Sequence, residues 1–89
     1  MNENTSLPQF TFKPRWKEEL VCSSSNGSLV IEMTMGILGV YCPTEEKWKK
    51  EAPAWAKNYW GSFKDQLEKW CTESKIPLYV EDSAWVAND

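Results

Sequence analysis

Apolar residues recur at helical spacing through the second half of the chain. When residues are placed at 100° intervals, eight apolar positions between 44 and 74 fall within an arc of roughly 120°. The residues on this stripe are Trp48, Ala52, Trp55, Ala56, Tyr59, Phe63, Leu67 and Trp70. Lysines and acidic residues occupy the opposite side. The pattern predicts an amphipathic helical region whose aromatic stripe packs against a core.

The two ends and the middle of this helical region carry further signals. Thr44 is a residue type that caps helix N-termini, and the two glutamates after it complement the dipole of the first turn. Pro53 lacks a backbone N–H and clashes with the preceding turn, so it breaks or kinks a helix. We therefore expect either two helices, at about 44–51 and 53–74, or one helix with a kink. The stripe stays in phase across the proline, which indicates one shared core.

The first half of the chain alternates apolar and polar residues, as strands do. Residues 10–12 read as a short strand that stops before Pro14. Asn26-Gly27 is a residue pair that favours a tight hairpin turn. Because such a turn needs a strand on each side, a strand over residues 15–24 is preferred to two turns of helix.

The hairpin turn also predicts a register. With Asn26 and Gly27 at its tip, one face of the hairpin is mainly apolar and the other is mostly polar. The predicted pairs on the apolar face are Ser24 with Leu29, Cys22 with Ile31, Leu20 with Met33, and Glu18 with Met35. Gly36 and Gly39 interrupt the apolar stretch that follows, and a bulge or second turn at Gly36 divides it into two strands, the second of them over residues 37–42. A sheet of this kind packs one face on a helix and leaves the other in water.

Together these elements predict one α+β domain. Residues 77–81 read as a closing strand, whose proline places it at a strand start or a sheet edge, and residues 84–86 return to the body after a turn. The predicted fold is a two-layer sandwich in which an antiparallel sheet of 3–5 strands is covered on one face by the long broken helix. Residues 9–87 form this domain, and residues 1–8 precede it as a flexible N-terminus.

The composition supports a small folded domain. The chain has 89 residues, 42% of them hydrophobic and 13% aromatic, with six tryptophans and a net charge of -3. These values exclude a disordered chain, and the length suits a single core. The apolar runs are far shorter than the roughly 20 residues of a membrane span, and no secretion signal is evident. We therefore expect a cytoplasmic protein that contacts no membrane and keeps its three cysteines reduced.

The residue types of common catalytic sites are mostly missing. The sequence has no histidine, no phosphate-binding glycine loop and no spacing of metal ligands, so no catalytic residue, cofactor or metal site is predicted. Cys42 is a weak candidate nucleophile because it precedes a helix N-terminus, although a small buried hydrophobe is the more ordinary role. Cys22 and Cys71 are expected in the core. Glu18, opposite Met35, is a candidate for a partly buried acid.

The densest group of positive charge is formed by Lys47, Lys49 and Lys50. A nucleic-acid interface needs such a cluster because its affinity comes mainly from neutralised phosphates. Three glutamates between positions 45 and 51 cancel this charge. Nucleic-acid binding is therefore disfavoured.

The tryptophans divide into those that the fold needs and those that it does not. Three of them lie on the helical stripe, and Trp16 is expected at the edge of the hairpin's apolar face. Trp60 lies at the margin of the stripe next to Gly61, which would let another backbone approach, and Trp85 lies near the C-terminal end. Trp60, Gly61 and Trp85 are therefore the candidate interaction surface. Half-burial of each tryptophan against a loop is the more ordinary arrangement.

The aromatic excess and the missing catalytic chemistry favour a non-catalytic protein-interaction domain. We expect a small cytosolic adaptor, subunit or inhibitor, of bacterial or phage type, whose partner is another protein or a homodimer mate. The first alternative is a small-ligand-binding protein or an enzyme that uses Cys42 or an acid such as Glu18. The second alternative is nucleic-acid binding through Lys47, Lys49 and Lys50.

Overall fold

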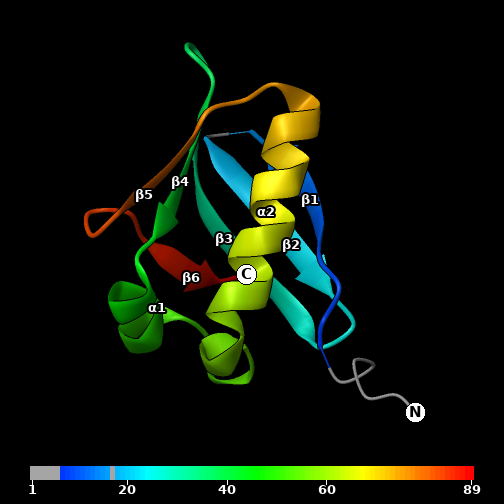
Figure 1. Cartoon of the computed structure of the whole chain (residues 1–89), viewed down its shortest axis with the longest axis vertical. Coiled ribbons are helices and arrows are strands. Elements are labelled where there is room, and N and C mark those ends of the chain that lie inside the picture. The colour runs from blue at the N-terminus through cyan, green and yellow to red at the C-terminus, as the bar shows by residue number, and fades with distance from the viewer. Residues whose placement is uncertain (1–6, 17) are drawn as a thin grey trace.

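The computed structural model describes residues 7–16 and 18–89. Within them the chain forms a six-stranded mixed sheet with helices on one face (Figure 1). The elements, in chain order, are β1 (Thr11–Arg15), β2 (Glu19–Ser24), β3 (Gly27–Thr34), β4 (Gly39–Pro43), α1 (Glu45–Glu51), the 3₁₀ helix η2 (Ala54–Tyr59), α2 (Trp60–Ser74), β5 (Leu78–Glu81) and β6 (Val86–Asn88). The predicted α+β class is confirmed. Residues 1–6 of the predicted flexible N-terminus lie outside the described residues, and Pro8 is buried.

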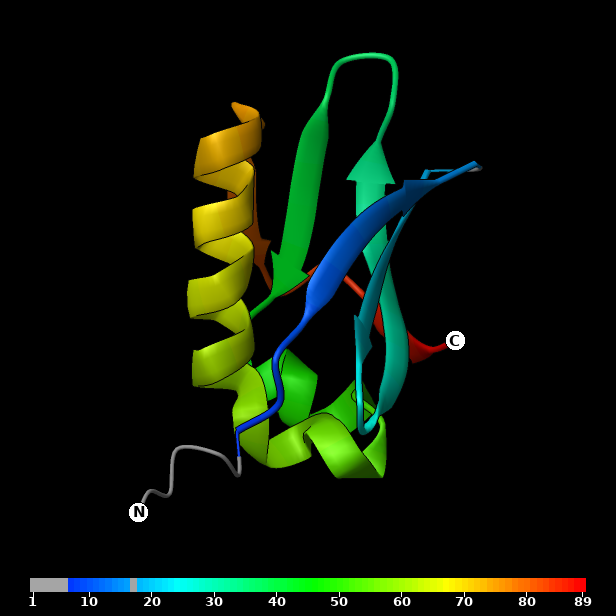
Figure 2. The same ribbon diagram turned by 90° about the vertical axis from the view of Figure 1, so that its right-hand side faces the viewer.

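The sheet is larger than predicted and mixed rather than antiparallel. Its strands lie in the order β1-β2-β3-β4-β5, and neighbours are antiparallel except for the parallel pair β4 and β5. The pair is parallel because α2 returns the chain to the end of the sheet at which β4 began, as Figure 2 shows. The sixth strand, β6, pairs with β3 at 29–31, directly beside residues 32–34, which pair with β4. β4 and β6 therefore share one edge of β3.

The hairpin between β2 and β3 turns one residue earlier than predicted. Ser25 and Asn26 form the turn, so that Ser24 pairs with Gly27. The register thus differs from the predicted one by two residues, and because two residues are a full strand period, each side chain keeps its predicted face. The Ser24 hydroxyl accepts a hydrogen bond from the Asn26 N–H at 3.1 Å. Gly27 has a φ of 149°, a value that residues with side chains rarely adopt.

β1 runs through Pro14, where the sequence predicted that pairing would stop. Proline is tolerated here because β1 is an edge strand, so that its missing N–H faces no neighbouring strand. The chain then turns, with Glu18 at a φ of 64°, before β2 begins at Glu19. The strand predicted over residues 15–24 is therefore wrong in its first part, because Trp16 and Glu18 belong to a turn.

Pro53 breaks the helical region, as predicted. α1 ends before Pro53. The Pro53 carbonyl accepts a hydrogen bond of 2.9 Å from the Ala56 N–H in the first turn of η2. Regular α-helix begins only at Trp60. The helix predicted over 53–74 is therefore a 3₁₀ helix in its first part and an α-helix in its second.

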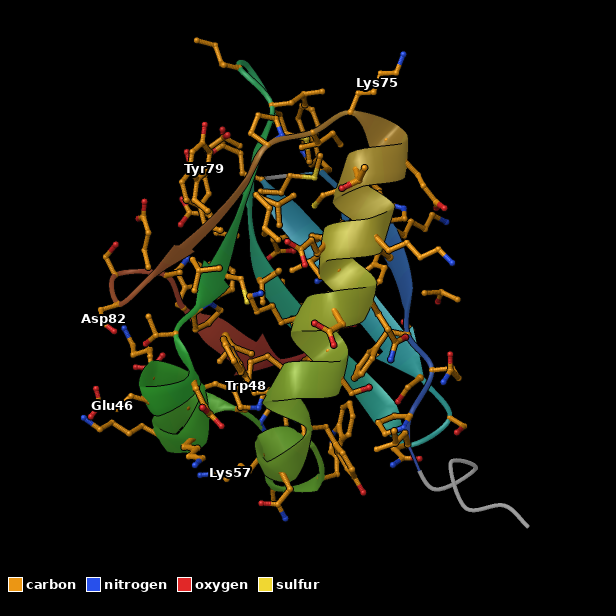
Figure 3. The ribbon with its side chains drawn as sticks, in the orientation of Figure 1. Glu46, Trp48, Lys57, Lys75, Tyr79 and Asp82 are labelled. Carbon is orange, nitrogen blue, oxygen red and sulfur yellow. The ribbon has the colours of Figure 1, made fainter. Side chains whose placement is uncertain are left out.

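α1 matches the helix predicted over 44–51 and is fastened at its N-terminus. Thr44 is its N-cap, and the Thr44 hydroxyl accepts a hydrogen bond from the Lys47 N–H at 3.3 Å. The same hydroxyl donates to a carboxylate oxygen of Asp82, and the Lys47 Nζ donates to the Asp82 carbonyl at 2.8 Å. The turn between β5 and β6 is thereby held against α1 (Figure 3).

The core lies between the inner face of the sheet and the helices, which cover that one face (Figure 2). Trp48 and Phe63 are the largest fully buried side chains, and their ring centres are 4.6 Å apart. The Trp48 Nε1 donates a hydrogen bond to the Ala56 carbonyl at 2.9 Å, so its polar atom is satisfied. Trp55 and Trp70 are partly buried and pack on the same cluster. The predicted aromatic stripe thus packs on the core.

Candidate interaction surface

Trp60 lies where the start of α2 meets the end of β4. Its side chain is partly buried against the core cluster, and its Nε1 donates a hydrogen bond to the Pro43 carbonyl at 2.9 Å. The Nζ of Lys64 lies 5.9 Å from the centre of the Trp60 ring, a cation–π distance. Trp60 therefore joins the first turn of α2 to the end of β4, and this packing leaves only part of its ring to a partner.

Gly61 and Trp85 lie on different elements. Gly61 is exposed on α2, and a Cβ built there would have no heavy atom within 4 Å. It lines a groove of about 550 Å³ together with Leu7 and Tyr59. Trp85 is partly buried in the loop before β6, between the buried residues Ala84 and Val86. The aromatic contacts found among residues 7–16 and 18–89 do not join Trp85 to Trp60.

The most exposed large apolar side chains are Trp16 and Ile37, with 83% and 90% of their surfaces exposed, and Leu38 is 45% exposed. Trp16 lies in the turn between β1 and β2, and the other two lie in the turn between β3 and β4. Both turns are at the same end of the sheet (Figure 2). The Met33 N–H, near the end of β3, donates a hydrogen bond of 3.1 Å to the carbonyl of Glu18, in the turn before β2. We call Trp16, Ile37 and Leu38 the turn patch.

The sequence reasoning missed the turn patch. Trp16 was predicted at the edge of the apolar face of the hairpin, and this is wrong because the chain turns there. Residues 37 and 38 were assigned to a strand, whereas β4 begins only at Gly39. The signal was the pair of glycines at 36 and 39, which bracket a turn as readily as they mark a bulge.

Cys42 is buried and poorly suited to act as a nucleophile. Burial raises the pKa of its thiol to about 12, and the nearby Lys64 charge and the Trp60 indole lower it only in part. Burial likewise raises the pKa of Cys71 to about 11 and that of Cys22 well above its ordinary value. The predicted core positions of Cys22 and Cys71 are confirmed. At neutral pH all three side chains are thiols rather than thiolates.

The acidic candidate does not lie where the sequence predicted. Glu18 is exposed in the turn before β2 and is not paired on the apolar face, so this candidate for a partly buried acid is not buried. Across residues 7–16 and 18–89, no cluster of three or more Cys, Asp or Glu side chains is arranged to hold a metal ion.

Two of the three lysines of α1 lie close to glutamates. Lys47 lies 3.8 Å from a Glu51 carboxylate oxygen, and Lys49 lies 3.7 Å from one of Glu45. Lys50 is exposed and makes no ion pair with the other described residues. These contacts leave little uncompensated positive charge for phosphates.

Comparison with protein-family models, with curated proteins and with solved structures found no match to this chain. No helix in the described part of the chain is both long and apolar enough to cross a membrane.

Proposed function

We propose that this chain is a non-catalytic protein-interaction domain and that the turn patch is its main contact surface. One observation carries the proposal: Trp16 and Ile37 expose 83% and 90% of their surfaces at the same end of the sheet. Isolated apolar residues on a surface are ordinary, but a tryptophan and an isoleucine this exposed on two turns at one end of a sheet are a candidate contact surface.

A partner that buries these exposed apolar side chains gains binding free energy. Covering a fully exposed isoleucine side chain stabilises a complex by about 1.5–3 kcal/mol. Tryptophan is among the residues most enriched at the energetic centres of protein interfaces. A partner that covers both residues would gain a large part of the affinity of a small interface from them.

The turn that carries Ile37 is held in place by local bonds. The Thr34 hydroxyl donates a hydrogen bond to the Ile37 carbonyl at 2.7 Å, and Thr34 pairs with Gly39 across the turn. A side chain on a braced turn loses little conformational freedom on binding, so more of its contact energy remains as affinity. The backbone of the turn that presents Ile37 is therefore already ordered before a partner binds.

The surface predicted from sequence, Trp60 with Gly61 and Trp85, is the weaker candidate. Both tryptophans are partly buried, and the Trp60 indole bonds to the Pro43 carbonyl. The enzyme alternative loses support because Cys42 is buried and its pKa is raised to about 12. The nucleic-acid alternative loses support because Lys47 and Lys49 lie beside glutamates.

The test compares a double variant, Trp16→Ser with Ile37→Ser, with the control Val80→Ser. Val80 is 41% exposed on the edge strand β5 and pairs with Cys42, toward the opposite end of β4 from the turn that carries Ile37. Affinity purification from the source cells tests a partner protein, and sedimentation equilibrium tests a second copy. We expect the double variant to lose the partner or the self-association at least tenfold while the control keeps it. Equal recovery and equal mass for all three proteins would contradict the proposal.

A further inference from the structure

A groove of about 480 Å³ runs between the edge strand β1 and the helix α2. Phe10, Phe12 and Trp70 provide its apolar lining, and the rings of Phe12 and Trp70 are 5.8 Å apart. Lys69 and Glu73 lie along its helical side and are exposed. β1 has no strand on this side among the described residues. The groove is separate from the turn patch.

The hydrogen-bond pattern of the sheet shows which backbone groups of β1 face this groove. In an antiparallel ladder, alternate residues direct their N–H and C=O toward the same neighbour. The Glu18 carbonyl accepts from Met33 in β3, so even-numbered residues of β2 bond to β3 and odd-numbered residues bond to β1. The odd-numbered residues of β1 therefore bond to β2, because each pairs with an odd-numbered residue there. Phe12 and Pro14 direct their backbone groups away from β2.

The chain just before β1 shows that this side can be occupied. The Gln66 side chain on α2 donates through Nε2 to the Pro8 carbonyl at 3.0 Å, and its Oε1 accepts from the Phe10 N–H at 2.8 Å. A side-chain amide thus makes the two bonds that a peptide group of a neighbouring strand would make. Two residues further on, the N–H and C=O of Phe12 have no such partner among the described residues, and the C=O of Pro14 is likewise unpaired.

We propose that the groove between β1 and α2 binds an extended peptide segment of a partner protein, which pairs with Phe12 and Pro14 as an added strand. Backbone bonds to an edge strand give affinity, and the alternate side chains of the segment, placed over Phe10, Phe12 and Trp70, give specificity. This binding mode goes beyond the contact assigned to the turn patch and does not depend on it.

The charges beside the groove define the segment further. Lys69 and Glu73 are one helical turn apart, and neither lies within 4.0 Å of an opposite charge among the described residues. β1 and α2 run in the same direction (Figure 2), so Lys69 lies toward the Phe10 end and Glu73 toward the Pro14 end. The complementary segment carries an acidic side chain at the first end and a basic one at the second.

A second copy of this chain suits the edge less well than a foreign segment. Pro14 offers no N–H, and the Gln66 amide already takes the preceding position, so the free part of the edge is short. A proline and a short edge are features that protect sheets from pairing with their own copies. The free groups match a short segment of two or three residues that alternates apolar and polar side chains.

The experiment uses a phage-displayed library of random 12-residue peptides, selected against the immobilised full chain. The enriched peptide is synthesised and added to ¹⁵N-labelled protein, and amide hydrogen exchange is measured by NMR. In the free protein the Phe12 amide exchanges quickly, whereas the Lys13 amide, bonded to β2, is protected. On binding, the Phe12 amide slows at least tenfold and the Trp70 indole signal shifts.

Charge reversal supplies the matched comparison. Lys69→Glu weakens the selected acidic peptide at least tenfold, whereas Lys50→Glu, the same change on an exposed lysine of α1, weakens it less than twofold. A Trp16→Ser variant binds the peptide as the unaltered chain does, which separates this site from the turn patch. Three results overturn the proposal: no peptide is enriched, the Phe12 exchange rate stays unchanged on binding, or Phe12 is protected only in a dimer of this chain.

Discussion

The indole Nε1 of Trp60 donates a hydrogen bond of 2.9 Å to the carbonyl oxygen of Pro43. This bond joins the first residue of α2 to the last residue of β4, two elements that η2 and α1 separate along the chain. The Cys42 sulfur lies 3.3 Å from the same carbonyl oxygen. Trp60 thus contributes to the fold whether or not a partner also touches it.

Trp60→Phe is expected to remove this hydrogen bond while keeping an aromatic ring in the partly buried site. The loss should lower the free energy of unfolding by about 0.5–1.5 kcal/mol, measured by urea denaturation. Trp85→Phe is the control, because the hydrogen bonds found among the described residues include none from the Trp85 indole. If Trp60→Phe is as stable as the unaltered chain, the hydrogen bond to Pro43 contributes nothing to the free energy of unfolding.

Gly27 and Gly61 are expected to respond to alanine with opposite signs. A Cβ at Gly27 would lie 2.8 Å from the Nε1 of Trp55, at a φ of 149° that alanine rarely adopts, so Gly27→Ala should destabilise the chain by about 1–3 kcal/mol. A Cβ at Gly61 meets open space on a helix, so Gly61→Ala should stabilise it by up to about 1 kcal/mol. Thermal unfolding distinguishes the two, and shifts of the same sign would refute this account.

Thr44 serves both the start of α1 and the turn between β5 and β6. Thr44→Ala removes the N-cap and the bond to Asp82 together, so a loss of about 0.5–2 kcal/mol in the free energy of unfolding is expected. Thr44→Ser keeps the hydroxyl and should retain most of the stability. Guanidinium denaturation of both variants provides the measurement, and equal losses for Ser and Ala would show that the methyl group, not the hydroxyl, matters.

The sequence predicted well the elements that rest on long periodic patterns. The stripe that includes Trp48 and Phe63 repeats over many residues, so an error at one position does not change the face, and both side chains are fully buried. The helix break at Pro53 was predictable because proline removes a hydrogen-bond donor wherever it stands inside a helix. The number of strands was underestimated, because β6 has only three residues and pairs with a strand far away in the chain.

The turns were the least predictable part, and the turn patch lies on turns. Asn-Gly favours one hairpin geometry by local energetics alone, but Trp55 from η2 packs on Gly27 and a serine closes the turn one residue earlier. Pro14 stops a central strand but not an edge strand, and the position of β1 in the sheet follows from tertiary pairing. Trp16 was misplaced for this reason: its exposure depends on where β1 ends.

The turn patch should contribute little to folding. Trp16→Ser and Ile37→Ser remove side chains that are 83% and 90% exposed, and surface substitutions of this kind change the free energy of unfolding by less than about 0.5 kcal/mol. Chemical denaturation of each single variant checks this, with circular dichroism as a control for structure. A loss above about 2 kcal/mol would mean that these side chains pack on the fold.

The buried thiol of Cys42 should make the chain less stable in alkaline solution. Burial raises the pKa of Cys42 from 9.0 to about 12, so the folded state keeps the proton that the unfolded state begins to lose near pH 9. The stability that comes from this difference is complete below pH 9 and is lost as the pH rises from 9 toward 12, with a slope of at most about 1.4 kcal/mol per pH unit.

Urea denaturation between pH 8 and pH 11, for the unaltered chain and for Cys42→Ala, isolates this contribution. The variant carries a constant cost from the lost sulfur, so the difference in unfolding free energy between the two proteins should shrink as the pH rises above 9. Iodoacetamide gives an independent check, because a thiol that is buried and protonated should alkylate at pH 8 at least a hundredfold more slowly than glutathione. Alkylation of Cys42 at the rate of glutathione, together with a pH-independent difference, would instead make Cys42 an accessible thiolate and restore the enzyme alternative.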